Sequence, residues 1–520
     1  MGSHTFTITC LAQKSIEGKN QEPLADVFIL PVFQDLASPA LAQWEGLFQG
    51  GIKSIAADEG FDGKRGGCLV LRKHPQDKAP VQRLILCGLG NPKKLTPLGW
   101  EEALSKAITT AKQYQALSSL AVDLNPVLGV LTSEATVVNA VDAAYQATYQ
   151  SLEAADKNKK DSKKKTAALK SVVLISDKAK LNAVSALLPQ AESMAKARSL
   201  AKDLVNHPAN LKNTQTLVKV AKQLSKLPGL TVKIVDDVEW IEKEMPCFFE
   251  VAKGSVISDP PKFIQVRYKH PSSKAKIRRR VGLIGKSVIF DTGGYQVKPG
   301  DFMLTMKGDM TGGALVLATM QALSEIQPEG VEVTAMLAAT PNKIDSGAML
   351  PDAIVNTTCG KKVEIRHTDA EGRLTLIDAV AKMVDSAKGD QSIEEIVTIA
   401  TLTGSASRAV GRHIAVMAND EALRSRVVAA GALYGEPMQT LDVIEQDYED
   451  IKSKLDGADI INTSHNKNRG AQSAAAFVMS GAPETMPICH LDIAGADMTH
   501  DEKATGIGQK LLIQFVLNAQ

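Results

Sequence analysis

Short apolar runs alternate with helix-like stretches along nearly the whole chain, and this alternation restricts the fold more than any other feature of the sequence. In the first third of the chain, we predict strands over residues 5–10, 27–32, 68–72, 83–87 and 171–175. Residues 100–115 and 133–150 have the spacing of amphipathic helices, and Ser133 is the predicted N-cap of the second helix. Strands that alternate with helices in this way predict an α/β domain.

The alternation resumes after a helix-like connection. Residues 190–205 contain neither Gly nor Pro and are predicted to form a helix that ends near Asn206. Beyond it, strands are predicted over residues 231–235, 263–268, 281–290, 331–339, 396–400 and 488–493, and helices within residues 313–326 and after Arg373. We therefore expect an N-terminal α/β domain (residues 1–188), joined by a helix (189–206) to a larger C-terminal α/β domain (207–520) with a central mixed sheet.

Composition and charge argue against two classes of protein. The 60 Lys and Arg residues nearly cancel the 58 Asp and Glu residues, and only 4% of the chain is aromatic. Neither value gives a reason to expect nucleic acid as a partner. No run of about 18 apolar residues is present, so no membrane-spanning helix is expected.

Two further features bear on the surroundings of the protein. The N-terminus lacks a signal-peptide pattern, and the six cysteines lie far apart without a Cys-x-x-Cys pair. Both observations favour a reducing, cytoplasmic location. Residues 155–166 are polar and rich in lysine, which predicts a solvated loop, with a phosphate-binding tail as the alternative.

Candidate chemistry concentrates in three glycine-containing segments, which are residues 285–294, 298–313 and 367–374. Asp369, Glu371 and Arg373 are spaced by two residues, so in an extended segment they would project from one face. Burying these charges unpaired would be costly, and a metal ion or a bound anion would offset that cost. Oxygen ligands suit Mg and Mn and, together with nitrogen donors, Zn. The alternative is an exposed loop with a local ion pair.

The first segment brings a lysine and an aspartate to the end of an apolar strand. Lys286 and Asp291 precede the pair Gly293-Gly294; the alternative is an ordinary strand end with a solvated lysine. A phosphate-binding loop is excluded, because its first glycine would fall at Arg280 and a strand follows the lysine. The histidines near these segments, His367 and His490, are expected to be hydrogen-bonded residues rather than ligands.

Taken together, the segments resemble one family, the leucyl aminopeptidases or cytosol aminopeptidases. The family signature Asn-Thr-Asp-Ala-Glu-Gly-Arg-Leu matches residues 367–374 at seven of eight positions. Residues 285–294, 298–300 and 307–310 resemble further family motifs in the same order, as do residues 201–210, 401–404, 490–495 and 504–506. The match covers residues 195–520, whereas the N-terminal third is similar only in layout.

The resemblance implies a two-metal exopeptidase whose catalytic domain is the C-terminal one. Two divalent ions per subunit are expected, Zn or Mn in the first place, with Co and Mg also suited. By position, Lys286, Asp291, Asp309 and Glu371 would hold the tighter metal, and Asp291, Asp369 and Glu371 the more exchangeable one. Lys298 would stabilise the oxyanion, and Arg373 would hold a bicarbonate that acts as general base. The first side-chain pocket would be lined by Met306, Thr401, Gly404 and Ala494, which suits leucine-like N-terminal residues.

The implied partners are peptide substrates and five further copies of the chain, in a homohexamer built as a dimer of trimers. The N-terminal domain would then serve assembly or regulation. Two other functions stay open at this point. One is a catalytically silent member that acts as a binding or DNA-associated protein, and the other is a different two-metal hydrolase such as a phosphatase.

The chain departs from the family pattern at four places. His367 replaces the usual Asn and is expected to make a hydrogen bond behind the ligands, with an added ligand or base as alternatives. Residues 341–342 and 350–353 also differ, and because they lie outside the implied ligand set they are expected to change packing or specificity. Asp497 leaves the end of the side-chain pocket uncertain, since an aspartate there would favour basic residues.

Overall fold

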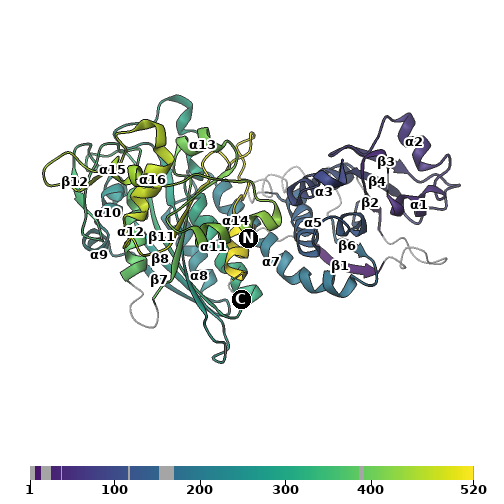
Figure 1. Ribbon diagram of the computed structural model, residues 1–520, viewed down its shortest axis with the longest axis horizontal. Helices are drawn as coiled ribbons and strands as arrows, with labels where there is room; N and C mark the ends of the chain where they lie inside the picture. Colours follow the sequence, from purple (N-terminus) through teal and green to yellow (C-terminus); the bar gives the residue numbers. More distant parts are fainter. Residues whose placement is uncertain are drawn as a thin grey trace. The chain divides into compact units, whose positions relative to one another are not determined.

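The computed structural model describes residues 6–12, 25–36, 38–114, 117–150, 169–385 and 392–518. The chain forms two compact units, one of Met1–Ser199 with Leu433–Gly435 and one of Leu200–Ala432 with Glu436–Gln520. Each unit has its own β-sheet with helices packed against it (Figure 1), which confirms the expected α/β class. Among the described residues, no helix has the length and apolar character needed to cross a membrane. The predicted loop at residues 155–166 lies outside the described residues.

The N-terminal unit contains a six-stranded sheet in the order β1-β6-β5-β2-β4-β3. Its strands are β1 (Thr7–Ala12), β2 (Val27–Val32), β3 (Cys68–Arg72), β4 (Arg83–Gly88), β5 (Ser119–Asp123) and β6 (Ser171–Ser176). All pairs are parallel except the pair of β3 with β4. The five strands predicted here are present with small differences at their ends, whereas β5 was not predicted.

Two long helices of this unit, α3 (Pro97–Ala111) and α5 (Ser133–Thr148), pack against each other. The predicted N-cap of α5 was wrong by one residue, because Thr132 holds that place and its Oγ1 accepts a hydrogen bond from the Ala135 amide at 3.1 Å. The shorter elements, with η for 3₁₀ helices, are η2 (Gln34–Leu36), α1 (Pro39–Glu45), α2 (Ile52–Asp58), η3 (Pro92–Lys94) and α4 (Asn125–Leu128).

The connecting helix is longer than predicted. Helix α7 (Leu181–Asn206) begins nine residues before the predicted start at residue 190 and contains Pro189. Proline lacks a backbone donor and its ring crowds the carbonyl four residues earlier, which usually kinks or ends a helix. Here the helix continues through Pro189. Within the N-terminal unit, Arg198 of α7 forms ion pairs with Glu101 and Asp142.

The C-terminal unit is built on a nine-stranded mixed sheet, as expected. Its order is β16-β15-β18-β14-β9-β11-β8-β7, and β10 also pairs with β11. The strands are β7 (Leu230–Val235), β8 (Lys262–Lys269), β9 (Arg279–Gly285), β10 (Ser287–Asp291), β11 (Val331–Asn342), β14 (Glu395–Ala400), β15 (Ile414–Ala418), β16 (Met438–Thr440) and β18 (Ile488–Asp492). The neighbours β18, β14, β9 and β11 run parallel. A small sheet consists of β12 (Ile354–Asn356), β13 (Lys362–Glu364) and β17 (Ile460–Ile461).

Helices cover both faces of the large sheet (Figure 1). On β11, Met336 belongs to the apolar core beneath α12 (Gly372–Asp385), whereas Leu337 lies next to Gly313 of α11 (Thr311–Ile326). This alternation, with every residue of β11 buried, is what a sheet between two helical layers requires. The other helices are α8 (Thr214–Leu224), α9 (Val238–Glu244), α10 (Pro246–Ala252), η4 (Lys253–Ser255), η5 (Gly300–Met303), η6 (Met306–Gly308), α13 (Gly404–Val410), α14 (Glu421–Tyr434), α15 (Glu445–Glu449), η8 (Lys467–Arg469), α16 (Gly470–Met479) and α17 (Gln509–Leu517).

The single strand predicted over residues 281–290 is in fact two strands that meet at Lys286. Strand β9 pairs with both β11 and β14, whereas β11 is the only described strand that pairs with β10. At the break, the Lys286 amide donates to the Ile399 carbonyl at 3.0 Å, and the Lys286 carbonyl accepts from Gly313 in the first turn of α11 at 2.8 Å. The break therefore places Lys286 at the point where the chain stops pairing with β14.

Candidate metal centre and substrate site

The central parallel strands of the C-terminal sheet end at one edge, and polar residues lie at these ends. Asp291 is the last residue of β10, Asn342 of β11 and Asp492 of β18, and Thr401 follows β14. The loops that leave neighbouring parallel strands at their carboxyl ends form a common site, which is where open α/β sheets bind ligands.

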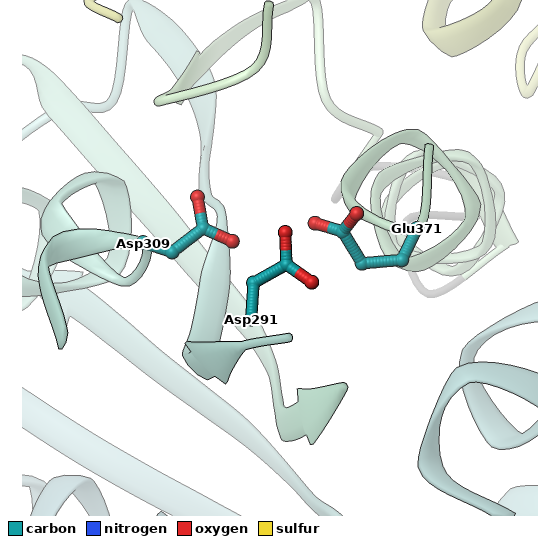
Figure 2. A group of neighbouring side chains, drawn as sticks. All are labelled: Asp291, Asp309 and Glu371. Carbon is teal, nitrogen blue, oxygen red and sulfur yellow. The ribbon is translucent and has the colours of Figure 1, made fainter. Parts of the chain in front are cut away.

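Three buried carboxylates face one another at this edge (Figure 2). Asp291, Asp309 and Glu371 each contribute an oxygen atom, and these atoms lie within 4.8 Å of one another. None of the three residues is more than 4% exposed. Burial raises the pKa of Asp309 well above its usual range, and the other two carboxylates add to this against the opposing effect of Lys286. A divalent cation would offset the crowded negative charge.

Lys286 lies inside this cluster and is not a solvated strand-end lysine. Its Nζ is 2.7 Å from Asp309 Oδ1 and 2.9 Å from Glu371 Oε1, and it donates to the Thr401 carbonyl at 3.0 Å. Burial lowers the pKa of Lys286, but the surrounding carboxylates outweigh burial and raise it. A role as metal ligand requires the neutral amine, so a cation that binds there would displace a proton.

Lys298 connects two of the implied ligands. Its Nζ lies 2.8 Å from Asp291 Oδ2 and 2.5 Å from Asp369 Oδ1. Burial lowers the pKa of Lys298, but Asp291 and Glu371 prevail and raise it, so the ammonium is charged. Burial and the same two carboxylates raise the pKa of Asp369 to about 6.

Arg373 lies in the first turn of α12, behind Glu371. It is buried, and it forms no ion pair with a residue that the structure describes. Burial lowers the pKa of Arg373 to about 10, while Glu371 and Asp492 oppose this effect. Its guanidinium therefore offers N–H donors next to the carboxylate cluster.

The segment that carries Asp369, Glu371 and Arg373 is not extended, so the prediction that they share one face of an extended chain was wrong. Residues 368–369 form a turn, and α12 begins at Gly372. The alternative of an exposed loop is also wrong for Glu371 and Arg373, both of which are buried. The turn, and not a strand, brings Asp369 and Glu371 to the two lysines.

Asn342 supports the cluster, and its role was missed from the sequence. Its Nδ2 donates to Asp291 Oδ1 at 2.8 Å and to the Thr368 carbonyl at 3.1 Å. Residues 341–342 were expected to affect only packing or specificity, whereas Asn342 orients an implied ligand. The available signal was that Pro341-Asn342 stands where the family usually has Glu-Asn, so the second of the two residues, the asparagine, is unchanged.

A second asparagine fixes the backbone of the same turn. Asn462 Oδ1 accepts from the amides of Arg366 and His367 at 2.7 and 3.1 Å, and its Nδ2 donates to the His367 carbonyl at 2.7 Å. No sequence pattern indicated this contact, which joins residues almost a hundred positions apart.

The implied pocket residues come from segments that border the cluster. Met306 opens η6, three residues before Asp309. Thr401 is in direct contact with the cluster, because its Oγ1 donates to Asp309 Oδ1 at 2.9 Å. Gly404 is the first residue of α13, and Ala494 follows β18.

Asp492, which was not singled out from the sequence, joins two of these segments. It accepts hydrogen bonds from the Leu402 amide at 3.1 Å, from Thr403 Oγ1 at 2.8 Å and from the Ala494 amide at 3.1 Å. Asp492 is fully buried, and these hydrogen bonds hold the loop after β14 against the loop after β18.

The two histidines make the hydrogen bonds that were expected. His367 Nδ1 accepts from the Asp369 amide at 3.2 Å, and burial together with Arg373 lowers the pKa of His367. His490 is buried in β18 and shares a hydrogen bond of 2.7 Å with Thr398 Oγ1.

Asp497 lies near the turn that carries Asp309. Its Oδ2 is 3.4 Å from the place that a β-carbon on Gly308 would take. Burial raises the pKa of Asp497 to about 6, and it forms no ion pair with a described residue. A preference for basic residues stays a prediction.

Four buried polar atoms at this site have no hydrogen-bond partner in the described part of the chain: Asp309 Oδ2, Asp369 Oδ1, Glu371 Oε1 and Arg373 Nε. Asp369 Oδ1 and Glu371 Oε1 still lie at ion-pair distance from Lys298 and Lys286, whereas Asp309 Oδ2 and Arg373 Nε form no ion pair with a described residue. A buried carboxylate oxygen without a donor fits a cation, and a buried guanidinium N–H without an acceptor fits an anion. Carboxylates with one amine form a donor set that suits Zn, Mn, Co and Mg.

Comparison with known proteins points in the same direction. Residues 199–513 match the catalytic domain of the cytosol aminopeptidase family, and residues 29–158 match the N-terminal domain of that family. The chain is 33% identical over 486 residues to the chloroplastic leucine aminopeptidase of Solanum tuberosum, covering 92% of this chain and 81% of that protein. It is 30% identical over 491 residues to a probable cytosol aminopeptidase of Persephonella marina, covering 93% and 94%.

Solved structures show the same similarity. A mutant of tomato leucine aminopeptidase has a TM-score of 0.83 and 28% identity, covering 100% of this chain and 98% of that one. The bottromycin maturation enzyme BotP in complex with Mn has a TM-score of 0.79 and 25% identity, covering 95% and 100%.

Proposed function

Because the chain belongs to the cytosol aminopeptidase family and is therefore a metal-dependent aminopeptidase, we propose that the carboxylate cluster of the C-terminal unit is its active site. The observation that carries this proposal is the meeting of Asp291, Asp309 and Glu371, three buried carboxylates within reach of one cation. The unpartnered Asp309 Oδ2 supports it. The proposed reaction is removal of leucine-like N-terminal residues from peptides.

Two divalent ions are proposed to bind at this cluster. The residues proposed for one ion are Lys286, Asp291, Asp309 and Glu371, and those for the other are Asp291, Asp369 and Glu371. We favour Zn or Mn, with Co and Mg as alternatives, and the Mn complex of BotP supports manganese for that relative. When bound, such ions act as Lewis acids that polarise the peptide carbonyl and lower the pKa of a water molecule.

The two cationic side chains have separate proposed roles. Lys298, which Asp291 and Glu371 keep charged, is a hydrogen-bond donor for the negative charge that develops on the carbonyl oxygen. Arg373 is proposed to hold bicarbonate as general base, because its Nε lacks a described acceptor and its planar fork matches a planar anion. Both groups lie close to the carboxylates and are partly or fully buried, where electrostatic effects are stronger than in water.

The substrate pocket is proposed to include Met306, Thr401, Gly404 and Ala494. Their largely apolar character suits leucine-like side chains, although a pocket of this kind separates aliphatic residues by only about 1–3 kcal/mol per methylene. Asp497 is the neighbouring group that would instead favour a basic residue, so both classes belong in the first substrate screen.

The decisive experiment is hydrolysis of leucine p-nitroanilide after removal of metal with a chelator. We expect Mn, Zn, Co or Mg to restore activity in the wild type and in the control D456N, which changes an exposed loop residue, but not in D291N. Folded wild-type protein that stays inactive with every metal, on leucine and on arginine substrates, would favour the catalytically silent alternative. Turnover of a phosphate ester in place of the anilide would favour a different two-metal hydrolase.

We also propose a homohexamer built as a dimer of trimers, and a cytoplasmic location. The family membership supports the first proposal, and light scattering that shows a stable monomer would contradict it. One relative is named a chloroplastic enzyme and another a cytosol aminopeptidase. Fractionation of the source cells therefore tests the proposed cytoplasmic location.

A further inference from the structure

We propose that Lys212 is a positioning residue for the metal centre, because it fastens the turn that precedes Asp309 to the end of α7. This inference rests on the proposed function, since the position of Asp309 matters for metal only if the cluster holds metal. Lys212 lies in the connection between α7 and α8 and is not among the residues assigned to the site above.

The side chain of Lys212 runs inward to three backbone carbonyls. The residue is only 4% exposed, and its Nζ donates to the carbonyls of Leu204 at 3.1 Å, Val205 at 3.2 Å and Lys307. A lysine ammonium has three N–H donors, so these three acceptors satisfy it completely.

The first two carbonyls explain how a positive charge is tolerated here. Leu204 and Val205 belong to the last turn of α7, whose carbonyls lack donors within the helix and form the negative end of its dipole. Among the described residues, no carboxylate forms an ion pair with Lys212. Burial and the nearby Lys307 lower the pKa of Lys212 to about 7, so the carbonyl dipoles offset only part of the cost of burying the charge. The three hydrogen bonds to carbonyl groups hold the side chain in place.

The third carbonyl belongs to a turn that needs external support. Lys307 is the middle residue of η6, which follows Thr305 with a φ of 69°. A β-branched residue in the left-handed region is strained and persists only where surrounding contacts fix it. Inside the turn, the Gly308 amide donates to the Thr305 carbonyl at 2.7 Å, and the Asp309 amide donates to the Met306 carbonyl at 3.2 Å. Lys212 adds the contact from outside.

Asp309 is thus held from two directions. Its carboxylate contacts Lys286 and Thr401 within the cluster, and its backbone follows a turn that Lys212 ties to α7. Loss of the second restraint lets the strained turn relax, and the carboxylate then moves away from the position that completes the ligand set. The second proposed metal does not use Asp309, so the effect falls mainly on one of the two ions.

The test is binding of Mn²⁺ to metal-free protein by titration calorimetry, with K212M as the variant. Methionine keeps most of the length of the side chain, which matters because Lys212 lines a cavity of about 260 Å³ that a smaller residue would enlarge. The matched control is K343M, because Lys343 lines the same cavity but makes no hydrogen bond to the site in the described part of the chain. We expect K212M to lower the affinity for the more tightly bound Mn²⁺ by about ten- to a hundredfold, as loss of a group that orients a ligand typically does. The affinity for the more weakly bound Mn²⁺ should change less, and K343M should bind both ions as tightly as the wild type does.

The possible outcomes separate this inference from the proposed function. If wild-type protein binds no Mn²⁺, the metal centre itself is wrong. If wild type and K212M bind both ions equally, Lys212 is a structural residue and the inference is wrong, whatever its melting temperature. If K212M does not fold, K212R replaces it: its planar guanidinium keeps the charge but cannot donate to three carbonyls that converge on one atom. Weaker tight-site binding in K212R supports the inference, and unchanged binding overturns it.

Discussion

Lys286 passes so close to Gly372 that a β-carbon on residue 372 would lie 2.4 Å from Lys286 Cε and 2.8 Å from its Nζ. Gly372 is the first residue of α12, where an alanine would otherwise favour the helix by up to about 1 kcal/mol. The glycine is therefore explained by the lysine beside it and not by the helix that it begins.

This relationship predicts that G372A separates stability from activity. The atoms in conflict are the far end of a flexible side chain, so we expect the chain to fold with a melting temperature within a few degrees of the wild type. The Lys286 ammonium must then leave Asp309 and Glu371, and hydrolysis of leucine p-nitroanilide should fall by more than about tenfold. The control is G360A, which changes a glycine with open space around it; because Gly360 has a φ of 87°, only its activity, and not its stability, serves as the reference. Full activity in G372A would mean that Lys286 need not hold its present position.

Asn342 gives a second prediction, because it orients Asp291 through a hydrogen bond of 2.8 Å. In N342A the carboxylate of Asp291 loses this donor, and we expect the affinity for Mn²⁺ to fall by about ten- to a hundredfold for both ions, since Asp291 is proposed to bridge them. N356A, which truncates an exposed asparagine in β12, is the control. Calorimetric titration measures the affinities, and equal values in N342A and wild type would show that Asp291 is held by other contacts, such as the Gly293 amide.

The sequence predicted most strands of the large sheet because buried central strands are mainly apolar, as the middle of β11 is. It did not predict the break between β9 and β10, because Gly285-Lys286-Ser287 interrupts the apolar run without a proline or a turn motif that would end a strand. The break depends on long-range contacts: Lys286 bonds Ile399 of β14 on one side and Gly313 of α11 on the other. Local patterns do not contain that information.

In the candidate site, too, the sequence predicted local features but not those that depend on long-range contacts. The motif of residues 367–374 indicated the ligand types, but a shared face for Asp369, Glu371 and Arg373 requires an extended chain, whereas α12 begins at Gly372. The contribution of Asn342 depends on β11 lying beside β10, and that of Asn462 on a segment far along the chain. The individual roles of Lys286, Asp369 and the pocket residues stay predictions, and G372A tests that of Lys286.

His490 predicts how stability depends on pH. Burial and the nearby Arg373 lower the pKa of His490 to about 3, while an unfolded histidine has a pKa of about 6.5. Between these values the unfolded chain binds a proton that the folded chain does not, so this contribution to stability is complete above pH 6.5 and is lost as the pH falls. The slope is about 1.4 kcal/mol per pH unit within that window.

Urea unfolding at pH 7.5, 6 and 5 measures this effect. We expect H490Q to be less stable than wild type at pH 7.5, because it disturbs the bond to Thr398, but to lose less stability on acidification. H500Q, which changes an exposed histidine, should follow the wild type. Parallel pH profiles for H490Q and wild type would show that other groups cause the acid sensitivity.

Arg373 gives the last prediction, which tests the proposed anion and not the metals. If its free Nε helps to hold bicarbonate as general base, wild-type activity should rise with added bicarbonate, whereas R373M should show neither the rise nor full activity. A general base typically contributes about 10²–10⁴-fold to rate, so we expect kcat of R373M to fall by at least about a hundredfold with KM changed much less. R373K keeps the charge without the planar fork and should recover only part of the rate. R72K, at an exposed position in β3, is the control. A bicarbonate response that persists in R373M would place the anion, if any, at another residue.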